Sequence, residues 1–215
     1  RQYSIDARNI KNPIYPCPIQ MGGKNANGQM LSIGNYYLSL DGKPFFGICG
    51  EAHFSRINRE LWEDEIIKMK AGGLNMIATY IFWIHHEEIE GTFDFSGNKD
   101  LRLFLELCKK NHMYVILRIG PFSHGECRNG GFPDWIYGQP FDIRCDDPSY
   151  LYYTRRFYEQ IYQQAKGLLF KDNGPVIGVQ LENEHEHASC PWEMTTENSK
   201  EWVVSGHDGK NHMST

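Results

Sequence analysis

The chain has 215 residues, a formal net charge of −5 and no block of basic residues, which argues against binding to nucleic acid or to an anionic membrane surface. No apolar run approaches the length needed to cross a bilayer, so no membrane insertion is expected. The six cysteines form no Cys-x-x-Cys pair, which excludes a structural zinc site of the usual spacing.

The N-terminal segment, residues 1–33, is rich in proline, asparagine and glycine and predicts an irregular lead-in to a domain formed by residues 34–215. The dipeptide Asp41-Gly42 lies between two apolar segments, residues 36–40 and 45–50, and this pattern is typical of a β-hairpin. We expect the second arm, residues 45–50, to be the first strand of the core.

Three amphipathic helices are expected to alternate with three further strands. The helices are predicted over residues 58–73, over residues 98–111, and from Asp147-Pro148 onward, where a capping residue precedes a proline at the first helical position. The periodicity of the last helix predicts inward-facing side chains at Leu151, Tyr158, Ile161, Ala165 and Leu168. The strands are predicted over residues 74–80, 113–119 and 176–181.

This order of elements is a series of βαβ units, which form a parallel sheet with right-handed crossovers. The loops that follow strands are long and rich in polar and aromatic residues, whereas those that follow helices are short and glycine-rich. That asymmetry favours the first half of a (β/α)8 TIM barrel, about four βα units, over a doubly wound sheet. No dinucleotide or phosphate-loop motif occurs, so a nucleotide-binding fold has no support.

The segment of residues 175–187 joins an apolar strand to a polar cluster that contains Glu182, Asn183 and Glu184. Side chains alternate along a strand, so Glu182 and Glu184 should share one face and Asn183 should lie on the other. If Asn183 and Glu184 act together, the strand must bulge or end at this point. Spacing alone does not decide which glutamate does chemistry, and a solvated acidic loop is the alternative.

Polar and aromatic side chains follow all four predicted strands of the core. They are Glu51, His53 and Arg56 after the first, Tyr80, Trp83, His85, His86 and Glu87 after the second, Arg118, His124 and Glu126 after the third, and Glu182, Asn183 and Glu184 after the fourth. Converging carboxylates and aromatic rings are the chemistry expected for cleavage of a glycosidic bond.

Seven short motifs in a fixed order carry a resemblance to a known family. They are Asp41-Gly42-Lys43-Pro44, Gly50-Glu51-Ala52-His53-Phe54-Ser55-Arg56, Lys70-Ala71-Gly72-Gly73-Leu74-Asn75, Thr79-Tyr80-Ile81-Phe82-Trp83 with His86-Glu87, Arg118-Ile119-Gly120-Pro121-Phe122, Gly130-Gly131-Phe132-Pro133-Asp134-Trp135 and Gln180-Leu181-Glu182-Asn183-Glu184. In this order they resemble the family-35 glycoside hydrolases, the β-galactosidase family.

The resemblance implies a retaining exo-β-glycosidase on a (β/α)8 barrel, with a carbohydrate substrate and neither metal nor cofactor. Glu184 would be the general acid/base, and Asn183 would hydrogen-bond the sugar 2-hydroxyl. Tyr80, together with the loop residues His124, Gly125 and Glu126, would match sugar-binding positions. The alternatives are that Tyr80 is a core aromatic and Glu126 a partner in a loop salt bridge, and we favour the sugar-binding role for both. Arg56 and Arg118 are expected to be structural and to pair with site carboxylates.

The resemblance also implies that the catalytic nucleophile comes from the end of the seventh strand of the barrel. This chain is expected to carry four strands, so we expect a fragment that lacks the nucleophile and is inactive alone. Glu184 is expected to be buried beside a second carboxylate, about 5–5.5 Å away, as in retaining enzymes. Enzymes of this kind mostly work outside the cytoplasm, which favours a secreted or periplasmic location.

The chain departs from the family pattern around the sugar pocket. The loop glutamate is normally preceded by Cys-Ala and followed by Trp, where this chain has His124, Gly125 and Cys127. Ile84 replaces an expected asparagine, and His185 an expected tyrosine. A β-glycosidase specific for a sugar other than galactose, or a sugar-binding homologue without hydrolysis, are therefore alternatives. A further alternative is a metal site formed by His85, His86, His185 and His187.

Overall fold

The computed structural model describes residues 13–16 and 21–184, and the chain divides between Gly47 and Ile48 into two compact units. The first unit holds a four-stranded antiparallel sheet of β1 (Gly22–Lys24), β2 (Met30–Ile33), β3 (Leu38–Leu40) and β4 (Lys43–Phe45), paired in this order. The turn between β3 and β4 is Asp41-Gly42, and both residues have positive φ, 51° and 75°. The predicted hairpin is confirmed, in the form that a two-residue turn of this composition favours.

Two predictions for the N-terminal part are wrong. The segment expected to be irregular contains β1 and β2, and the segment expected to be one strand over residues 45–50 is divided between β4 and a separate strand, β5 (Cys49–Glu51). The glycines of β1 caused the first error. A Cβ at Gly22 would lie 2.3 Å from the Leu31 carbonyl oxygen, so glycine is needed there for close strand pairing and does not mark a loop.

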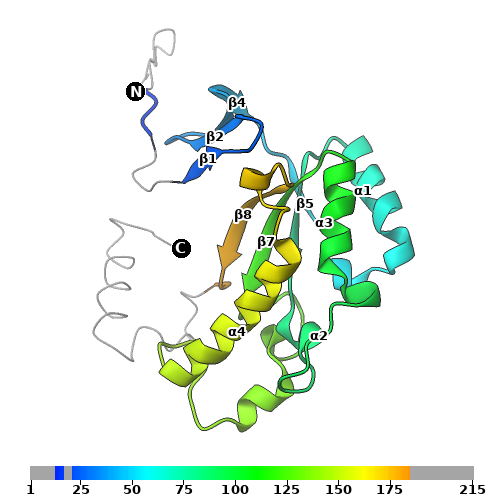
Figure 1. Cartoon of the computed structure of the whole chain (residues 1–215), viewed down its shortest axis with the longest axis vertical. Coiled ribbons are helices and arrows are strands. Elements are labelled where there is room, and N and C mark those ends of the chain that lie inside the picture. The colour runs from blue at the N-terminus through cyan, green and yellow to red at the C-terminus, as the bar shows by residue number, and fades with distance from the viewer. Residues whose placement is uncertain (1–12, 17–20, 185–215) are drawn as a thin grey trace, which may run out of the picture. The chain divides into compact units, whose positions relative to one another are not determined.

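The second unit is built on a parallel sheet. Its strands are β5, β6 (Met76–Tyr80), β7 (Tyr114–Gly120) and β8 (Val176–Leu181), which pair in sequence order and all run parallel. Helices α1 (Trp62–Ala71), α3 (Leu101–Lys110) and α4 (Pro148–Ala165) connect these strands, and α3 contacts both α1 and α4 (Figure 1). The short α2 (Trp83–His86) follows β6. The architecture is a partial (β/α)8 barrel, as predicted.

The core of this unit lies between the sheet and the helices. All five residues of β6 are buried, and α3 contributes Phe104 and Leu105 from its apolar stripe. Trp83 and Phe157 stack with their ring centroids 4.8 Å apart and their planes 2° from parallel. Aromatic packing therefore fixes α4 against α2, which follows β6.

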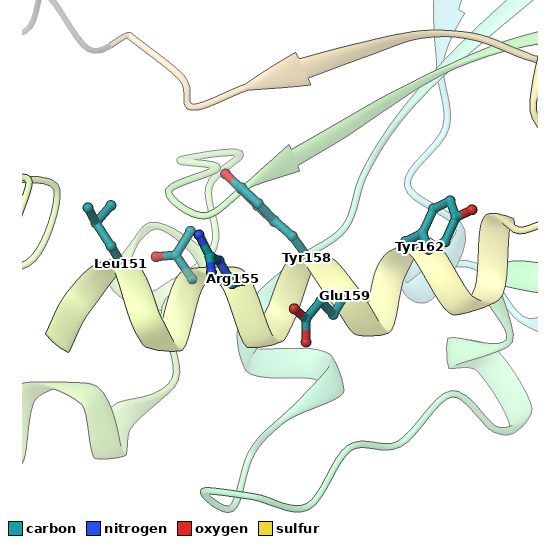
Figure 2. Close-up of a pocket in the computed structure, with 6 residues that line it drawn as sticks. Leu151, Arg155, Tyr158, Glu159 and Tyr162 are labelled. Atoms are coloured by element: carbon teal, nitrogen blue, oxygen red, sulfur yellow. The ribbon is translucent and has the colours of Figure 1, made fainter. Parts of the chain in front are cut away.

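The predicted inward face of α4 is confirmed at Ile161, Ala165 and Leu168, is half-buried at Tyr158, and is wrong at Leu151. Its buried stripe begins at Tyr150, whereas Leu151, which was expected to face inwards, is 47% exposed. The more open side of the helix lines a shallow pocket of about 450 Å³ formed by Leu151, Thr154, Arg155, Tyr158, Glu159 and Tyr162 (Figure 2). Beyond this pocket, the Tyr158 hydroxyl donates to the Gly120 carbonyl oxygen at 2.5 Å and so braces the end of β7. None of the helices in the described residues is long and apolar enough to span a membrane.

Gly174, which leads into β8, gives a first test of the fold. A Cβ at this position would lie 1.9 Å from backbone atoms of Leu168, and backbone cannot rotate out of the way as a side chain can. We therefore expect Gly174→Ala to lower the free energy of unfolding by about 2–3 kcal/mol, the upper part of the range for overpacking. Denaturant unfolding of the parent and the variant measures the difference.

The matched control is Gly138→Ala, because a Cβ at Gly138 meets no atom within 4 Å. This variant should unfold within about 0.5 kcal/mol of the parent. Equal stability of the two variants would contradict the packing described for Gly174.

Candidate active site

Three side chains at the carboxyl end of the parallel sheet lie in register on neighbouring strands. Arg118 of β7 pairs with Tyr80 of β6 on one side and with Gln180 of β8 on the other. Its guanidinium lies 3.7 Å from the centroid of the Tyr80 ring, and its Nε donates to Gln180 Oε1 at 3.0 Å. It also forms an ion pair with Glu51 at the end of β5. Arg118 thus links all four strands, and the predicted pairing with a site carboxylate is confirmed.

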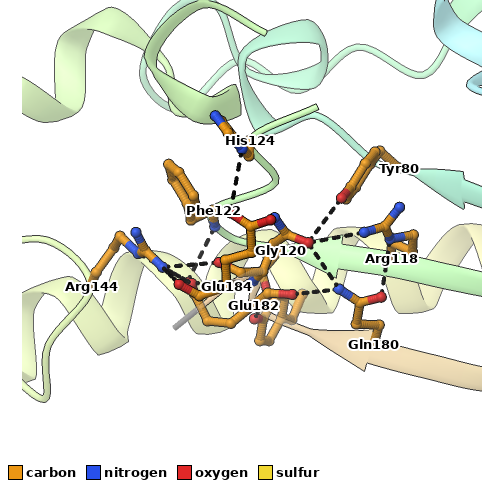
Figure 3. Close-up of polar contacts among 11 residues, drawn as sticks. Tyr80, Arg118, Gly120, Phe122, His124, Arg144, Gln180, Glu182 and Glu184 are labelled. Carbon is orange, nitrogen blue, oxygen red and sulfur yellow. Dashed lines mark hydrogen bonds and ion pairs between the residues drawn. The ribbon is translucent and has the colours of Figure 1, made fainter. Parts of the chain in front are cut away.

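The same arginine fixes the orientation of the Asn183 side chain. Asn183 Oδ1 accepts hydrogen bonds from Arg118 Nη2 at 2.9 Å and from the Tyr80 hydroxyl at 3.0 Å (Figure 3). A guanidinium can only donate, so the Asn183 atom that faces it must be the oxygen. The amide nitrogen, which has no partner among the described residues, is left to donate to a ligand.

The strand β8 ends at Leu181, and the backbone that follows takes an unusual path. Glu182 and Glu184 have φ values of 56° and 48°, in the left-handed region that non-glycine residues rarely adopt. Glu182 still donates its N–H to the Gly120 carbonyl oxygen at 2.7 Å. The expectation that Glu182 and Glu184 share a face is therefore wrong, because strand alternation stops one residue before the first glutamate. The structure instead meets the condition under which Asn183 and Glu184 can act together, because the strand ends before them.

Glu182 is occupied by contacts within the protein. It is 4% exposed, and its Oε2 lies 3.1 Å from Arg144 Nη2 and 3.2 Å from Arg144 Nε. Its other oxygen accepts the backbone N–H of Phe122 at 3.3 Å. Burial raises the pKa of Glu182, and the Arg144 guanidinium acts in the opposite direction. This carboxylate supports the loop structure and has no open side for a substrate.

The side chain of Glu184 is exposed to solvent. Its side chain is 57% exposed, and its Oε2 lies 3.7 Å from Nδ1 of His124. His124 in turn stacks on Phe122, with ring centroids 5.9 Å apart and planes 16° from parallel (Figure 3). The carboxyl of Glu184 is accessible from solvent, and the burial that was expected for it is not provided by the described residues.

The loop after β7 is packed onto the end of β6. Gly125 has a φ of 53°, and a Cβ there would lie 2.9 Å from Phe82 and 3.2 Å from Tyr80, so a larger residue would push the loop away. On either side of it, His124 and Glu126 are exposed. The structure therefore brings Gly125 of this loop next to Tyr80 and His124 next to Glu184.

His53 packs against Tyr80 and Phe82 and has a defined tautomer. Its Nδ1 accepts the backbone N–H of Tyr80 at 3.2 Å, so the ring proton belongs on Nε2, which faces a Glu51 oxygen at 3.9 Å. Burial lowers the pKa of His53, and the carboxylates of Glu51 and Glu126 partly oppose that shift. A neutral His53 therefore supports the backbone of Tyr80 near neutral pH.

Several residues that the sequence placed near the site turn away from it. Glu87 is fully buried and accepts from Trp83 Nε1 at 2.7 Å, and it is also paired with Arg156. Arg56 lies over the Phe82 ring at 4.3 Å, where a carboxylate partner had been expected. These side chains stabilise the second unit and do not line the site.

The histidines proposed as a possible metal site have other partners where the structure describes them. His85 Nδ1 is 2.8 Å from the Ser55 hydroxyl, and His86 Nδ1 is 3.0 Å from the Asp94 carbonyl oxygen. His185 and His187 lie outside the described residues. Within residues 13–16 and 21–184, no group of three or more histidine, cysteine, aspartate or glutamate side chains could hold a metal ion.

Arg144 and Gln180 have structural roles that no sequence pattern indicated. Arg144 lies 38 residues before Glu182, in a loop with no motif that marks it. Gln180 belongs to a quoted motif, but only the register of β7 and β8 shows that it faces Arg118.

Comparison with known proteins gives a consistent family. The model of a family described as Glycosyl hydrolases family 35 matches residues 37–213. The β-galactosidase of Xanthomonas manihotis is 37% identical over 169 residues, which cover 78% of this chain and 28% of that protein. The β-galactosidase of Homo sapiens is 39% identical over 167 residues, which cover 76% of this chain and 25% of that protein. The chain therefore spans about a quarter of the length of these relatives.

A solved structure supports the fold. The exo-β-1,4-mannosidase from Opitutaceae bacterium strain TAV5 superposes with a TM-score of 0.56 at 17% sequence identity, and the match covers 83% of this chain and 29% of that chain. At this level of identity the likeness concerns the fold alone.

The environment of His86 predicts a pH-dependent stability. The ring is buried, its Nε2 has no partner among the described residues, and burial lowers its pKa to about 4, against 6.5 for an ordinary imidazole. Between these two values the unfolded chain binds more protons than the folded one, so stability falls as the pH is lowered. We expect this effect of His86 to lower the free energy of unfolding by about 2–3 kcal/mol between pH 7 and pH 4.5.

In the variant His86→Phe this part of the pH dependence should disappear, whatever the stability at pH 7. The measurement is the free energy of unfolding of parent and variant at a series of pH values. His112→Gln, which removes an exposed imidazole, is the control and should keep the parent profile. Parallel profiles for the parent and His86→Phe would rule out a neutral, buried His86.

Proposed function

Because the chain belongs to glycosyl hydrolase family 35, we propose that it is part of a retaining exo-β-glycosidase of the β-galactosidase type. We propose that residues 34–215 belong to its N-terminal catalytic region, in which the second unit supplies the first four strands of the (β/α)8 domain, and that the nucleophile lies outside this chain. The substrate is a carbohydrate with a terminal β-linked sugar, such as an oligosaccharide, a polysaccharide side chain or a glycoconjugate. We propose a location outside the cytoplasm for it.

The observation that carries this proposal is the arrangement of Asn183 and Glu184 at the carboxyl ends of the parallel strands. Catalytic residues of (β/α)8 enzymes lie at this edge of the barrel. The oxygen of Asn183 is held by Arg118 and Tyr80, while the exposed carboxyl of Glu184 lies beside the loop of residues 124–126. A rigid hydrogen-bond donor and an accessible carboxyl are thus neighbours in one site.

The mechanism we propose is double displacement. Glu184 gives its proton to the glycosidic oxygen as the aglycone leaves, while the nucleophilic carboxylate attacks the anomeric carbon and forms a covalent glycosyl-enzyme. Glu184, now a carboxylate, takes a proton from water, and that water releases the sugar with its original anomeric configuration. Neither step needs a metal or a cofactor.

Asn183 binds the sugar in this scheme. Its Oδ1 is engaged by donors from three strands, Tyr80, Arg118 and Gln180, so its Nδ2 points its protons towards the site and donates to the sugar 2-hydroxyl. Hydrogen bonds to this hydroxyl strengthen as the oxocarbenium-like transition state forms. Tyr80, with the loop residues Gly125 and Glu126, forms the adjoining wall of the sugar site.

Galactose is the sugar we propose, and His124 is the reason to keep another sugar as the alternative. Its imidazole is 58% exposed and lies next to the proposed acid, where the family pattern has a smaller side chain. A panel of aryl β-glycosides that differ only in the sugar decides between galactose and another sugar. A complete protein that binds these sugars and cleaves none would be the non-hydrolytic homologue.

The role of Glu184 can be tested in the complete protein that carries this chain. In Glu184→Gln we expect kcat/KM for a phenyl β-galactoside, whose leaving group needs a proton, to fall by about 10²–10⁴. For a 2,4-dinitrophenyl β-galactoside, which departs without protonation, kcat/KM should change little. Steady-state kinetics on both substrates measure the difference.

The matched control is Glu106→Gln on α3, since this glutamate has a similar exposure but lies in an ion pair with Arg102. It should retain the parent values on both substrates. If Glu184→Gln kept near-normal kcat/KM on the phenyl substrate, Glu184 would not be the acid.

A further inference from the structure

We propose that Arg144 is a positioning residue for the proposed acid: together with Glu182 it holds the backbone of Asn183 and Glu184 in the conformation that presents both side chains to the substrate. The inference rests on the function proposed for Glu184, but Arg144 itself does not touch the substrate. It assigns a role to a loop residue that no motif singled out.

The contacts of Arg144 combine a side chain and the main chain. Its Nε and Nη2 donate to one oxygen of Glu182, and Nη2 also donates to the carbonyl oxygen of Asn183 at 3.0 Å and approaches that of Glu184 at 3.5 Å (Figure 3). Glu182 in turn accepts the backbone N–H of Asn183 at 3.4 Å. The guanidinium and the carboxylate therefore hold the same short segment from its carbonyl side and its N–H side.

This segment needs such support because its backbone is in a sparsely populated conformation. Glu182 and Glu184 both have positive φ, and so does Arg144, at 57°. Residues in such conformations persist only where the surroundings determine them. A buried arginine with a fixed fork of donors provides that determination, because it can bind a carboxylate and a carbonyl oxygen at once.

Arg144 also joins this segment to the loop that carries His124. Its guanidinium lies 3.8 Å from the centroid of the Phe122 ring, and the same ring stacks with His124. The backbone N–H of Phe122 donates to Glu182. The loop after β7 and the end of β8 are thus held by one buried pair, which fixes the position of Glu184 relative to its neighbour His124.

The test uses two variants of the complete protein. Arg144→Lys keeps the charge but loses the fork, and the double variant Arg144→Met with Glu182→Leu removes the pair without leaving a buried charge unpaired, so it should still fold. For each we expect kcat/KM on the phenyl β-galactoside to fall by about 10- to 100-fold, since a displacement of about 1 Å costs rate on this scale. On the 2,4-dinitrophenyl substrate the loss should be below about threefold, because that leaving group needs no acid.

The control is Arg156→Lys, which weakens the ion pair of Arg156 with the buried Glu87, a pair that does not contact Asn183 or Glu184. Arg156→Lys should change kcat/KM on the phenyl and the 2,4-dinitrophenyl substrate by the same factor. An equal loss on both substrates in the Arg144 variants, or no loss, would overturn the positioning role, because a purely structural arginine changes only the amount of folded enzyme.

A crystal structure of the double variant separates this proposal from the function it rests on. We expect the Glu184 backbone to shift, while Arg118 and Tyr80 keep the side chain of Asn183 in place. An unchanged segment would overturn the positioning role even if Glu184→Gln behaves as an acid variant. A shifted segment combined with a normal Glu184→Gln would instead overturn the acid role of Glu184.

Discussion

The candidate site depends on one local constraint: three consecutive side chains at the end of β8 have to point in three directions. A continued strand would place Glu182 and Glu184 on one face, with Asn183 opposite. The left-handed backbone at both glutamates removes this alternation. Glu182 turns into the protein towards Arg144, Asn183 turns towards Tyr80 and Arg118, and Glu184 remains open to solvent. Hydrogen bonds on both sides of the segment compensate for the uncommon backbone conformation.

Two arginines, Arg118 and Arg144, stabilise the segment that follows β8. Arg118 sits in the sheet, where parallel register places it between Tyr80 and Gln180, and it orients the amide of Asn183. Arg144 comes from a loop and binds the carbonyl oxygen of the same residue. Removing either arginine would leave a carboxylate and an amide oxygen with fewer donors at a partly buried position. The loss of folding free energy would then exceed the net contribution of the hydrogen bonds themselves. The side chain and the main chain of Asn183 are therefore fixed independently.

The sequence predicted β6, β7 and β8 of the parallel sheet well because each of these strands is an apolar run, whereas β5 was not separated from β4. The apolar run of residues 176–181 is β8 to the residue, and Asp147-Pro148 marks the first turn of α4. Two kinds of feature gave weaker signals. The short strand β1 consists of Gly-Gly-Lys, and its glycines resemble those of a loop although they are needed for close strand pairing. In α4, Leu151 lies one position from the buried stripe of the helix. Long-range contacts such as that of Arg144 with Glu182 depend on the loop path, which no periodicity encodes.

The two glutamates at the end of β8 show why environment, and not spacing, assigns their roles. Burial raises the pKa of Glu182, but its oxygens already accept from Arg144 and from the backbone of Phe122. To give a proton to a substrate it would have to break a buried ion pair and expose an arginine without a partner, at a cost of several kcal/mol. Glu184 has no such cost, because its carboxyl is exposed and contacts His124 Nδ1 only at 3.7 Å. Access to the substrate therefore favours Glu184 as the acid, and burial makes Glu182 the residue that holds it in place.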